Sequence, residues 1–492
     1  MTVCASRFSN PIRRTTLCLR PRGGADNAKE SAATAAVERR EVQAPGQASP
    51  TADPNLLEKG HRWLRSFVAY ACKVFGLRKG LEAVQDTRQD PAISTYVVAT
   101  ALFFCGLLRI RSLNALEPKL REKPFVRLVG GASKEGGLGS ADTLSRSLRQ
   151  TKIATVRALS VGIVAKAERN KVFREGWIGA MHAVAIDGWE PISSYHRHCD
   201  QCLTRHVRVE LGGKVVEVEQ YYHRYAVAML MDDRFDMALD IEPLLPADLR
   251  PGGAGKNGEH EGEQTAAIRL LRRVKQTFGW LEVVVADGLY PNGPFLTVVK
   301  QLRMSAVVIA KKDGDEPLKE ALVLWDNKPA DHVIVDEKAK ERVELWDCRD
   351  LRTLSTYDGP IRVVRARITD TEQPQRPHRT WCMVVTGVAA DRLTSHSVLR
   401  MARGRWHIEN TGFHQWTTLW HFAHVFVRDA NGMLALYWLF FVAFNLLTLF
   451  LYCQVRCYGR DRGKDVTCTI SRLVEEMRDE LARLDSSPWD TS

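Results

Sequence analysis

The chain has 492 residues, 45% of them hydrophobic, and a formal net charge of +12. This length exceeds one ordinary domain, so several folded units are expected. The positive charge favours a polyanionic partner, because neutralised phosphates release counterions, although basic proteins also bind acidic membranes. The eleven cysteines follow no framework, and the N-terminus lacks an apolar core long enough for export. These features argue against a secreted disulfide scaffold and predict reduced thiols in a cytoplasm.

Two segments of different composition open the chain. Residues 1–55 are rich in Ala, Ser, Pro, Gly and charge, a composition that predicts disorder. Residues 56–178 have a helical pattern: LLEKGHRWLRSFVAYACKVFGL is amphipathic with basic spacing, and ISTYVVATALFFCGLLRIRSLNALEPKL follows a proline. The residues by themselves predict a helical bundle there.

A mixed sheet is predicted next. Gly212 and Gly213 separate TRHVRVEL from KVVEVEQYY, which indicates a hairpin, and RYAVAMLM is predicted as a third strand. With the apolar run Ala183–Ile186 these strands would form the antiparallel part of the sheet. A helix over Glu263–Thr277 then crosses over to a second apolar run, Val283–Ala286.

Further elements are predicted toward the C-terminus. IRVVRARI and RTWCMVVTGV have the pattern of strands and indicate a β-rich insertion over residues 313–394. The segment Ser395–Trp420 has helical spacing and no proline, so it is predicted as one helix. A polar tail is expected over residues 457–492.

Three acidic residues stand where a two-metal site would need them: Asp187 in AVAIDGWE, Asp287 in VVVADGLY and Glu409 in RWHIENTGFHQW. Each aspartate follows a short β-branched run and is therefore predicted at the end of a buried strand, with Glu409 leaning over both from a helix. Carboxylates at such places can hold Mg²⁺, and two such ions can activate the attacking oxygen and stabilise the leaving one. The competing interpretation is that each aspartate is a turn or cap residue.

Three stretches in the same order resemble the DDE transposases of bacterial insertion sequences: DIEPLLP, EQTAAIRLLRRVKQTFGWLEVVVADGLYPNGPFLTVVKQL and RWHIENTGFHQW. Many members of that family carry Tyr-x2-Arg-x3-Glu-x6-Lys around the third acid. Arg405 and Glu409 match this signature, whereas Ala402 and Trp416 stand where the Tyr and the Lys would be. Histidines that lie nearby are candidate substitutes for the lysine: His414, His421 and His424.

The resemblance covers residues 90–450 and implies an α/β fold, a ribonuclease H-like mixed sheet flanked by helices, with a β-rich insertion and a helical N-terminal domain. It implies an endonuclease and strand-transfer enzyme with Asp187, Asp287 and Glu409 as catalytic residues and Mg²⁺ ligands, Mn²⁺ being able to substitute. The implied partners are double-stranded DNA, as terminal inverted repeats and as target, and a second copy of the chain when two ends are paired. The implied location is the bacterial cytoplasm, at the nucleoid, with no membrane partner.

The predicted units follow in chain order. Residues 1–55 are a tail, residues 56–178 a helical accessory domain that would bind DNA, and residues 179–312 the first part of the catalytic core. Residues 313–394 are the insertion, residues 395–456 the C-terminal helices of the core, and residues 457–492 a polar tail.

Contacts with DNA are expected from one helix face. Arg405, Glu409, Gly412 and Trp416 are spaced by four, three and four residues, so they share a face in an α-helix. Arg405 could contact a phosphate, Trp416 could stack on an unpaired base, and His414 is a further candidate. The alternatives are an ion pair of Arg405 with Glu409 and a core position for Trp416.

A second constellation lies in SYHRHCDQCLTRH, where Cys199 and Cys202 form a Cys-x2-Cys pair with His196 and His206 nearby. Such a knuckle with one or two histidines could hold zinc. The alternative is a loop whose basic residues reach DNA.

Two rival functions remain open from the sequence. Leu434–Cys453 is long enough to span a bilayer and Ile93–Leu108 is a shorter candidate, so an integral membrane protein is one alternative. A buried helix that covers the sheet is favoured over a span. The other alternative keeps the fold, as a nuclease or a decayed transposase.

Overall fold

The structure is a computed structural model and describes residues 62–130, 137–211, 213–250, 259–310, 316–455 and 468–491. These residues all belong to one unit, Leu57–Ser492. The tail predicted as disordered, residues 1–55, lies outside the described residues.

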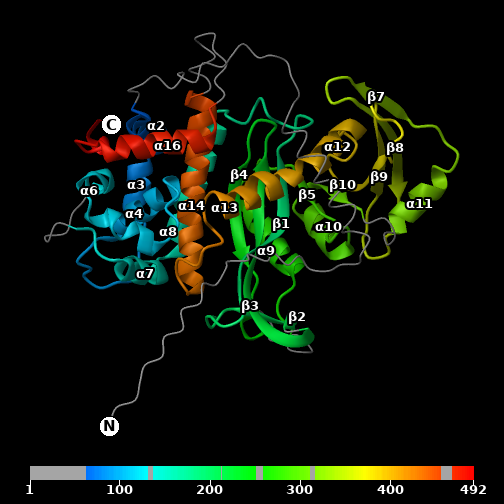
Figure 1. The fold of residues 1–492 in the computed structure, drawn as a ribbon. Coiled ribbons are helices and arrows are strands. Elements are labelled where there is room, and N and C mark those ends of the chain that lie inside the picture. The colour runs from blue at the N-terminus through cyan, green and yellow to red at the C-terminus, as the bar shows by residue number, and fades with distance from the viewer. Residues whose placement is uncertain are drawn as a thin grey trace. The chain divides into compact units, whose positions relative to one another are not determined.

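A single mixed sheet of ten strands organises the described residues (Figure 1). Its order is β2-β3-β1-β5-β6-β10-β9-β8-β7, with β4 also paired to β3. β1, β5 and β6 are parallel to one another, and the other pairs are antiparallel. The strands are β1 (Ala183–Ser194), β2 (Leu203–Leu211), β3 (Lys214–Met231), β4 (Met237–Pro243), β5 (Val283–Ala286), β6 (Ser305–Ile309), β7 (His332–Asp336), β8 (Glu341–Leu351), β9 (Ile361–Asp370) and β10 (Arg379–Gly387).

The parallel centre of the sheet is apolar because it is covered on both faces. All of β5 and nearly all of β6 are buried, as expected for parallel strands joined by crossover helices. α9 (Glu263–Thr277) supplies one crossover, over the residues predicted for it, and packs on β3 and β4. α10 (Gly293–Gln301) supplies the next and packs on β6. The predicted α/β fold class, a mixed sheet flanked by helices with a helical N-terminal region, is confirmed.

The antiparallel part of the sheet departs from the prediction in one respect. The hairpin of β2 and β3 forms as expected, but KVVEVEQYY and RYAVAMLM are one continuous strand, β3. Its first half pairs with β2 and its second half with β4, so no turn is needed between them. The sequence analysis did not predict β4, because this strand carries two acidic residues, Asp240 and Glu242, which interrupt the apolar pattern. Both acids are buried in ion pairs with Arg273 on α9, which offsets part of the cost of burying their charge.

The β-rich insertion forms as predicted and extends the same sheet. It contains α11 (Glu316–Leu324) and β7 to β10, among them the two expected strands. β10 pairs antiparallel with β6, with Val384 opposite Val308. The insertion therefore adds strands to the edge of the core sheet.

Helices occupy the region before β1, as predicted for residues 56–178. They are α2 (Trp63–Phe75), α3 (Leu77–Glu82), α4 (Thr95–Leu107), α5 (Leu113–Leu116), η1 (Lys119–Arg121), α6 (Lys123–Val129), α7 (Ala141–Gln150) and α8 (Ile153–Arg169). A short turn, η2 (Ala247–Leu249), follows β4.

One long apolar helix joins these helices to the sheet. α14 (Ala430–Phe450), the orange helix of Figure 1, packs against α4, α7 and α8 on one side and β4 on the other. With the π-turn η4 (Leu451–Val455) it is long and apolar enough to cross a membrane, yet 94% of its apolar window is buried inside the protein. The prediction of a buried helix that covers the sheet is confirmed.

The described part of the segment predicted as a polar tail contains a helix and a short turn. α16 (Ile470–Ala482), followed by η5 (Pro488–Thr491), packs on α2. Glu480 of α16 accepts hydrogen bonds from the backbone N–H groups of Leu64 and Arg65, at 2.6 and 3.2 Å. These donors belong to the first turn of α2 and have no partner within their own helix. These contacts with α2 therefore position the polar helix α16.

Asn445 offers a test of how α14 is held to the sheet. Its side-chain amide makes two hydrogen bonds with the backbone of Ala238 on β4, at 2.9 and 2.8 Å, and it is fully buried. Asn445→Leu would leave both backbone groups unsatisfied, so we expect a loss of about 2–4 kcal/mol in the free energy of unfolding, measured with urea.

Thr448 is the matched control, since its buried hydroxyl has no hydrogen-bond partner. Thr448→Val should change stability by less than about 1 kcal/mol. Equal losses in the two variants would contradict this account of the Asn445 contact.

Candidate active site

Two aspartates lie at equivalent positions on neighbouring strands. β1 and β5 pair in parallel, with Ala185 opposite Val285, and Asp187 and Asp287 each follow two residues later. Strands so paired run about 4.8 Å apart. The strand register therefore brings together two acids that are 100 residues apart in the sequence.

The surroundings of the two aspartates differ. Asp287 follows the end of β5, and its carboxylate accepts from the N–H of Leu289 at 2.9 Å. Asp187 lies inside β1, so the prediction that it ends a strand is wrong. β1 leaves β5 after Ala185 but stays paired with β3, with Asp187 opposite Val227.

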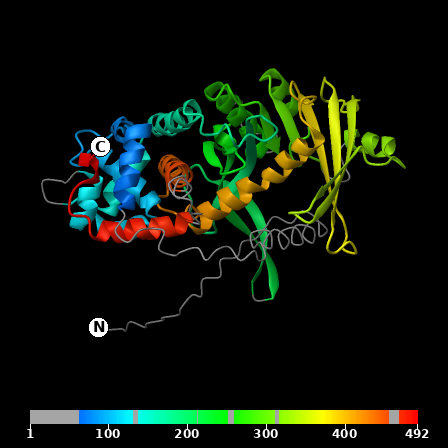
Figure 2. The same ribbon diagram turned by 90° about the horizontal axis from the view of Figure 1, so that it is seen from above.

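Glu409 comes from a helical run that lies over the sheet (Figure 2). The predicted single helix is three pieces: α12 (Ser395–Gly404), a π-helix η3 (Ile408–His414) and α13 (Gln415–Thr418). Single π-turns are often found at functional sites because they change the aim of side chains. Glu409 belongs to this π-turn, which contacts β1.

Arg405 connects the helix to the strand. Its Nη1 lies 2.8 Å from Oδ2 of Asp187 and 2.9 Å from Oε1 of Glu409. The guanidinium is buried, so it bridges two carboxylates inside the protein. The ion pair with Glu409, one of the two interpretations of this residue, is therefore present, and a second pair accompanies it.

A fourth carboxylate, which the sequence analysis missed, completes the cluster. Glu263 is the first residue of α9 and lies against Gly188, where a Cβ would come within 2.0 Å of Oε2 of Glu263. It accepts from the Tyr290 hydroxyl at 2.8 Å and pairs with Arg224. One sequence feature could have predicted this residue as part of the site. Glu263 begins the helix that crosses over to the Asp287 strand, and the start of such a helix lies near the strand ends.

The cluster raises the pKa of Asp187 to about 8. Burial of the carboxyl is the main cause, and repulsion from Glu409, Asp287 and Glu263 adds to it, while Arg405 opposes it. The phenol of Tyr290 is affected in the same way, by burial and by Glu263, so that its pKa is raised well above the usual value. Negative charge is therefore in excess at this place.

This donor set suits a hard divalent cation. Four carboxylates against the guanidiniums of Arg405 and Arg224 leave a net charge of minus two when all are ionised. Carboxylate oxygens are the ligands preferred by Mg²⁺ and Mn²⁺. The four carboxylates are less closely gathered than a bound ion would require: among the described residues, only Cys199, Cys202 and His223 bring three His, Cys or carboxylate ligand atoms within 4.8 Å of one another.

The predicted DNA contacts are placed as follows. Trp416 is fully buried and packs against Trp189 and Phe441, with ring centroids at 5.4 and 4.7 Å. The prediction that it stacks on a base is corrected: it is a core residue, the competing interpretation. His414 is exposed, and Gly412 faces Met229 on β3.

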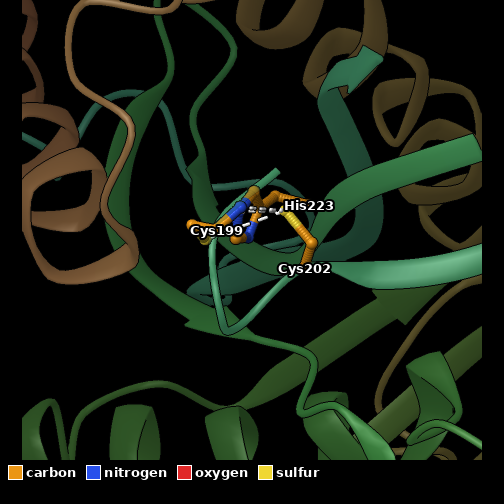
Figure 3. A group of neighbouring side chains, drawn as sticks. All are labelled: Cys199, Cys202 and His223. Atoms are coloured by element: carbon orange, nitrogen blue, oxygen red, sulfur yellow. Dashed lines mark hydrogen bonds between the residues drawn. The ribbon is translucent and has the colours of Figure 1, made fainter. Parts of the chain in front are cut away.

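The predicted zinc constellation is rearranged. Cys199 and Cys202 lie together, but their neighbour is His223 on β3 (Figure 3). His196 and His206 are exposed and lie outside this group. The sequence offered no signal for His223, because β-strand pairing alone brings it to the loop.

Asp187→Asn tests the raised pKa of this carboxyl. The unfolded chain releases the proton near pH 4, whereas the folded chain keeps it to about pH 8. Stability of the metal-free wild type should therefore fall as pH rises between these values, by at most about 1.4 kcal/mol per pH unit for this group. We expect urea unfolding in EDTA to show the wild type losing stability relative to Asp187→Asn as pH rises. The control Asp326→Asn, at an exposed position, should show the same dependence of stability on pH as the wild type. If the stability of all three proteins changes with pH in parallel, the raised pKa of Asp187 is contradicted.

Comparison with known families agrees with the geometry. Residues 244–446 match a family model described as a transposase DDE domain, and a comparison with curated proteins gave no match. Asp287, Arg405 and Glu409 lie inside the matched range, and Asp187 precedes it. Enzymes with this domain bind DNA, act inside the cell and generally use divalent metal ions. The chain thus carries a transposase DDE domain, which implies a phosphoryl-transfer enzyme that cleaves DNA and transfers its strands.

Proposed function

We propose that this chain is the transposase of a bacterial insertion sequence and that Asp187, Asp287 and Glu409 are its catalytic carboxylates. The observation that carries the proposal is the shared register of the two aspartates on β1 and β5, with Glu409 joined to Asp187 through Arg405. The substrates are the terminal inverted repeats of the element and a target duplex, and the place of action is the bacterial nucleoid.

Mg²⁺ is the ion that we propose for this site, with Mn²⁺ as a substitute. When bound, such ions supply an activated oxygen nucleophile and stabilise the leaving oxygen of an in-line displacement. Asp187, Asp287 and Glu409 would hold them, and Asp187 must lose its proton to take part. Zinc is not proposed here, because all the donors at this place are oxygens.

Arg405 has a positioning role in this proposal. It is buried and bound to two of the acids, so its charge serves to hold them in place rather than to contact a phosphate directly. Glu263 has a related role: with Tyr290 and Arg224 it fixes the strand of Asp187 against α9. Glu263 adds to the negative field that a bound cation would neutralise, whereas Arg405 reduces it.

DNA contact is proposed for exposed basic residues outside the acid cluster. His414 lies one turn beyond Glu409 and is exposed, and residues of the β2–β3 hairpin such as Arg208 and Lys214 are exposed as well. Such side chains would meet phosphates and supply sequence-independent affinity. Pairing of two element ends would bring two copies of the chain together.

Asp287→Asn is the test of the catalytic assignment. With a labelled duplex that carries the candidate terminal repeats, we expect the wild type to nick at the repeat boundary and to join the freed 3′ end to a target when Mg²⁺ or Mn²⁺ is added. The variant should bind the same duplex and lower cleavage by at least about a hundredfold. Asp326→Asn, on an exposed loop, should cleave as the wild type does.

A second measurement separates metal binding from activity. Mg²⁺ should raise the melting temperature of the wild type, since a ligand that binds only the folded state stabilises it, and should raise that of Asp287→Asn less. Normal cleavage by Asp287→Asn would refute the assignment of the acid. Nicking without strand transfer in the wild type would indicate a nuclease on the same fold.

A further inference from the structure

A group of soft metal ligands lies where three segments of the antiparallel sheet meet. Cys199 and Cys202 belong to the loop between β1 and β2, and His223 belongs to β3, opposite Ile192 of β1 (Figure 3). All three side chains point toward one another. The register of β1 and β3 therefore joins a histidine to a Cys-x2-Cys pair more than twenty residues before it.

The distances in this group fit a tetrahedral zinc ion. With usual zinc bond lengths of about 2.3 Å to sulfur and 2.0 Å to nitrogen, a tetrahedron sets the sulfurs about 3.8 Å apart and each sulfur about 3.5 Å from the nitrogen. The two Sγ atoms are 3.7 Å apart, and Nε2 of His223 lies 3.3 Å from each of them. The sulfurs are too far apart for a disulfide, in which they lie about 2.05 Å from each other.

The surroundings favour a bound cation as well. His223 is buried, with 7% of its surface exposed, and Cys199 packs against the core. Both thiols are partly buried.

We propose that Cys199, Cys202 and His223 bind one zinc ion, which fastens the loop between β1 and β2 to β3 and so fixes the base of the β2–β3 hairpin. Water occupies the fourth tetrahedral position, because three protein ligands leave one open. Two thiolates and an imidazole select zinc over Mg²⁺, which takes oxygen ligands.

The zinc site is separate from the acid cluster. His223 lies four residues before Val227, the β3 residue that faces Asp187, which is about 14 Å along the strand. The ion would therefore have a structural role, and the proposal does not depend on which residues catalyse DNA cleavage. Its effect on DNA would come through the hairpin, because β2 begins at the loop that the ion holds.

Metal analysis of the full-length protein tests the proposal. We would purify the chain from cells supplied with zinc, remove loosely held metal on a desalting column and measure metals by mass spectrometry. We expect about one zinc per chain in the wild type and loss of zinc in Cys199→Ser, Cys202→Ser and His223→Ala. Matched controls are Cys348→Ser, a partly buried cysteine on β8, and His206→Ala, an exposed histidine on β2; both should keep the zinc.

Cobalt substitution keeps the test decisive when a ligand variant fails to fold. Wild-type protein loaded with Co²⁺ should show the intense visible bands of a tetrahedral ion and the charge-transfer absorption of two thiolates. Folded wild type without zinc, a disulfide between Cys199 and Cys202, a different bound metal, or the pale spectrum of octahedral cobalt would each overturn the proposal. Loss of zinc from Cys348→Ser or His206→Ala would also contradict the ligand set.

Discussion

The pairing of β1 with two different neighbours is the constraint on which the chemistry of this protein depends. On one side β1 is parallel to β5, and this register places Asp187 beside Asp287. On the other side it is antiparallel to β3, and that register brings His223 to the Cys199 and Cys202 loop. A shift of one residue would turn every side chain of β1 to the opposite face, so both arrangements depend on the register of this one strand.

The treatment of buried acids distinguishes the candidate active site from the rest of the core. On β4, Asp240 and Glu242 meet arginines from α8 and α9, namely Arg157, Arg269 and Arg273. Their charge is neutralised inside the protein. At the candidate active site four carboxylates share two guanidiniums, and burial together with the neighbouring acids raises the pKa of Asp187. A fold that leaves negative charge uncompensated there gives up stability for the capacity to bind a cation.

α14 shows how little composition says about the surroundings of an apolar helix. Its residues would suit a bilayer by length and hydropathy, but a helix that is apolar on all sides also fits where two layers cover it. The helical N-terminal region covers one side and the sheet the other. Asn445, which would be costly in lipid, satisfies the backbone of an otherwise half-paired edge strand, β4. The same residue therefore counts against a membrane span and for a tertiary contact.

The sequence by itself determined the fold class, the helix α9 to its end residues, the β2–β3 hairpin, the strands of the insertion and the acids Asp287 and Glu409 within a DDE domain. These follow from local patterns, because hydrophobic periodicity and glycine turns act over a few residues. Tertiary structure alone decided that β3 is continuous, that the helix of Glu409 contains a π-turn, that Trp416 belongs to the core, and that Glu263 and His223 join sites formed by distant residues. Strand register and helix packing bring together residues far apart in the chain, and no local pattern records those contacts.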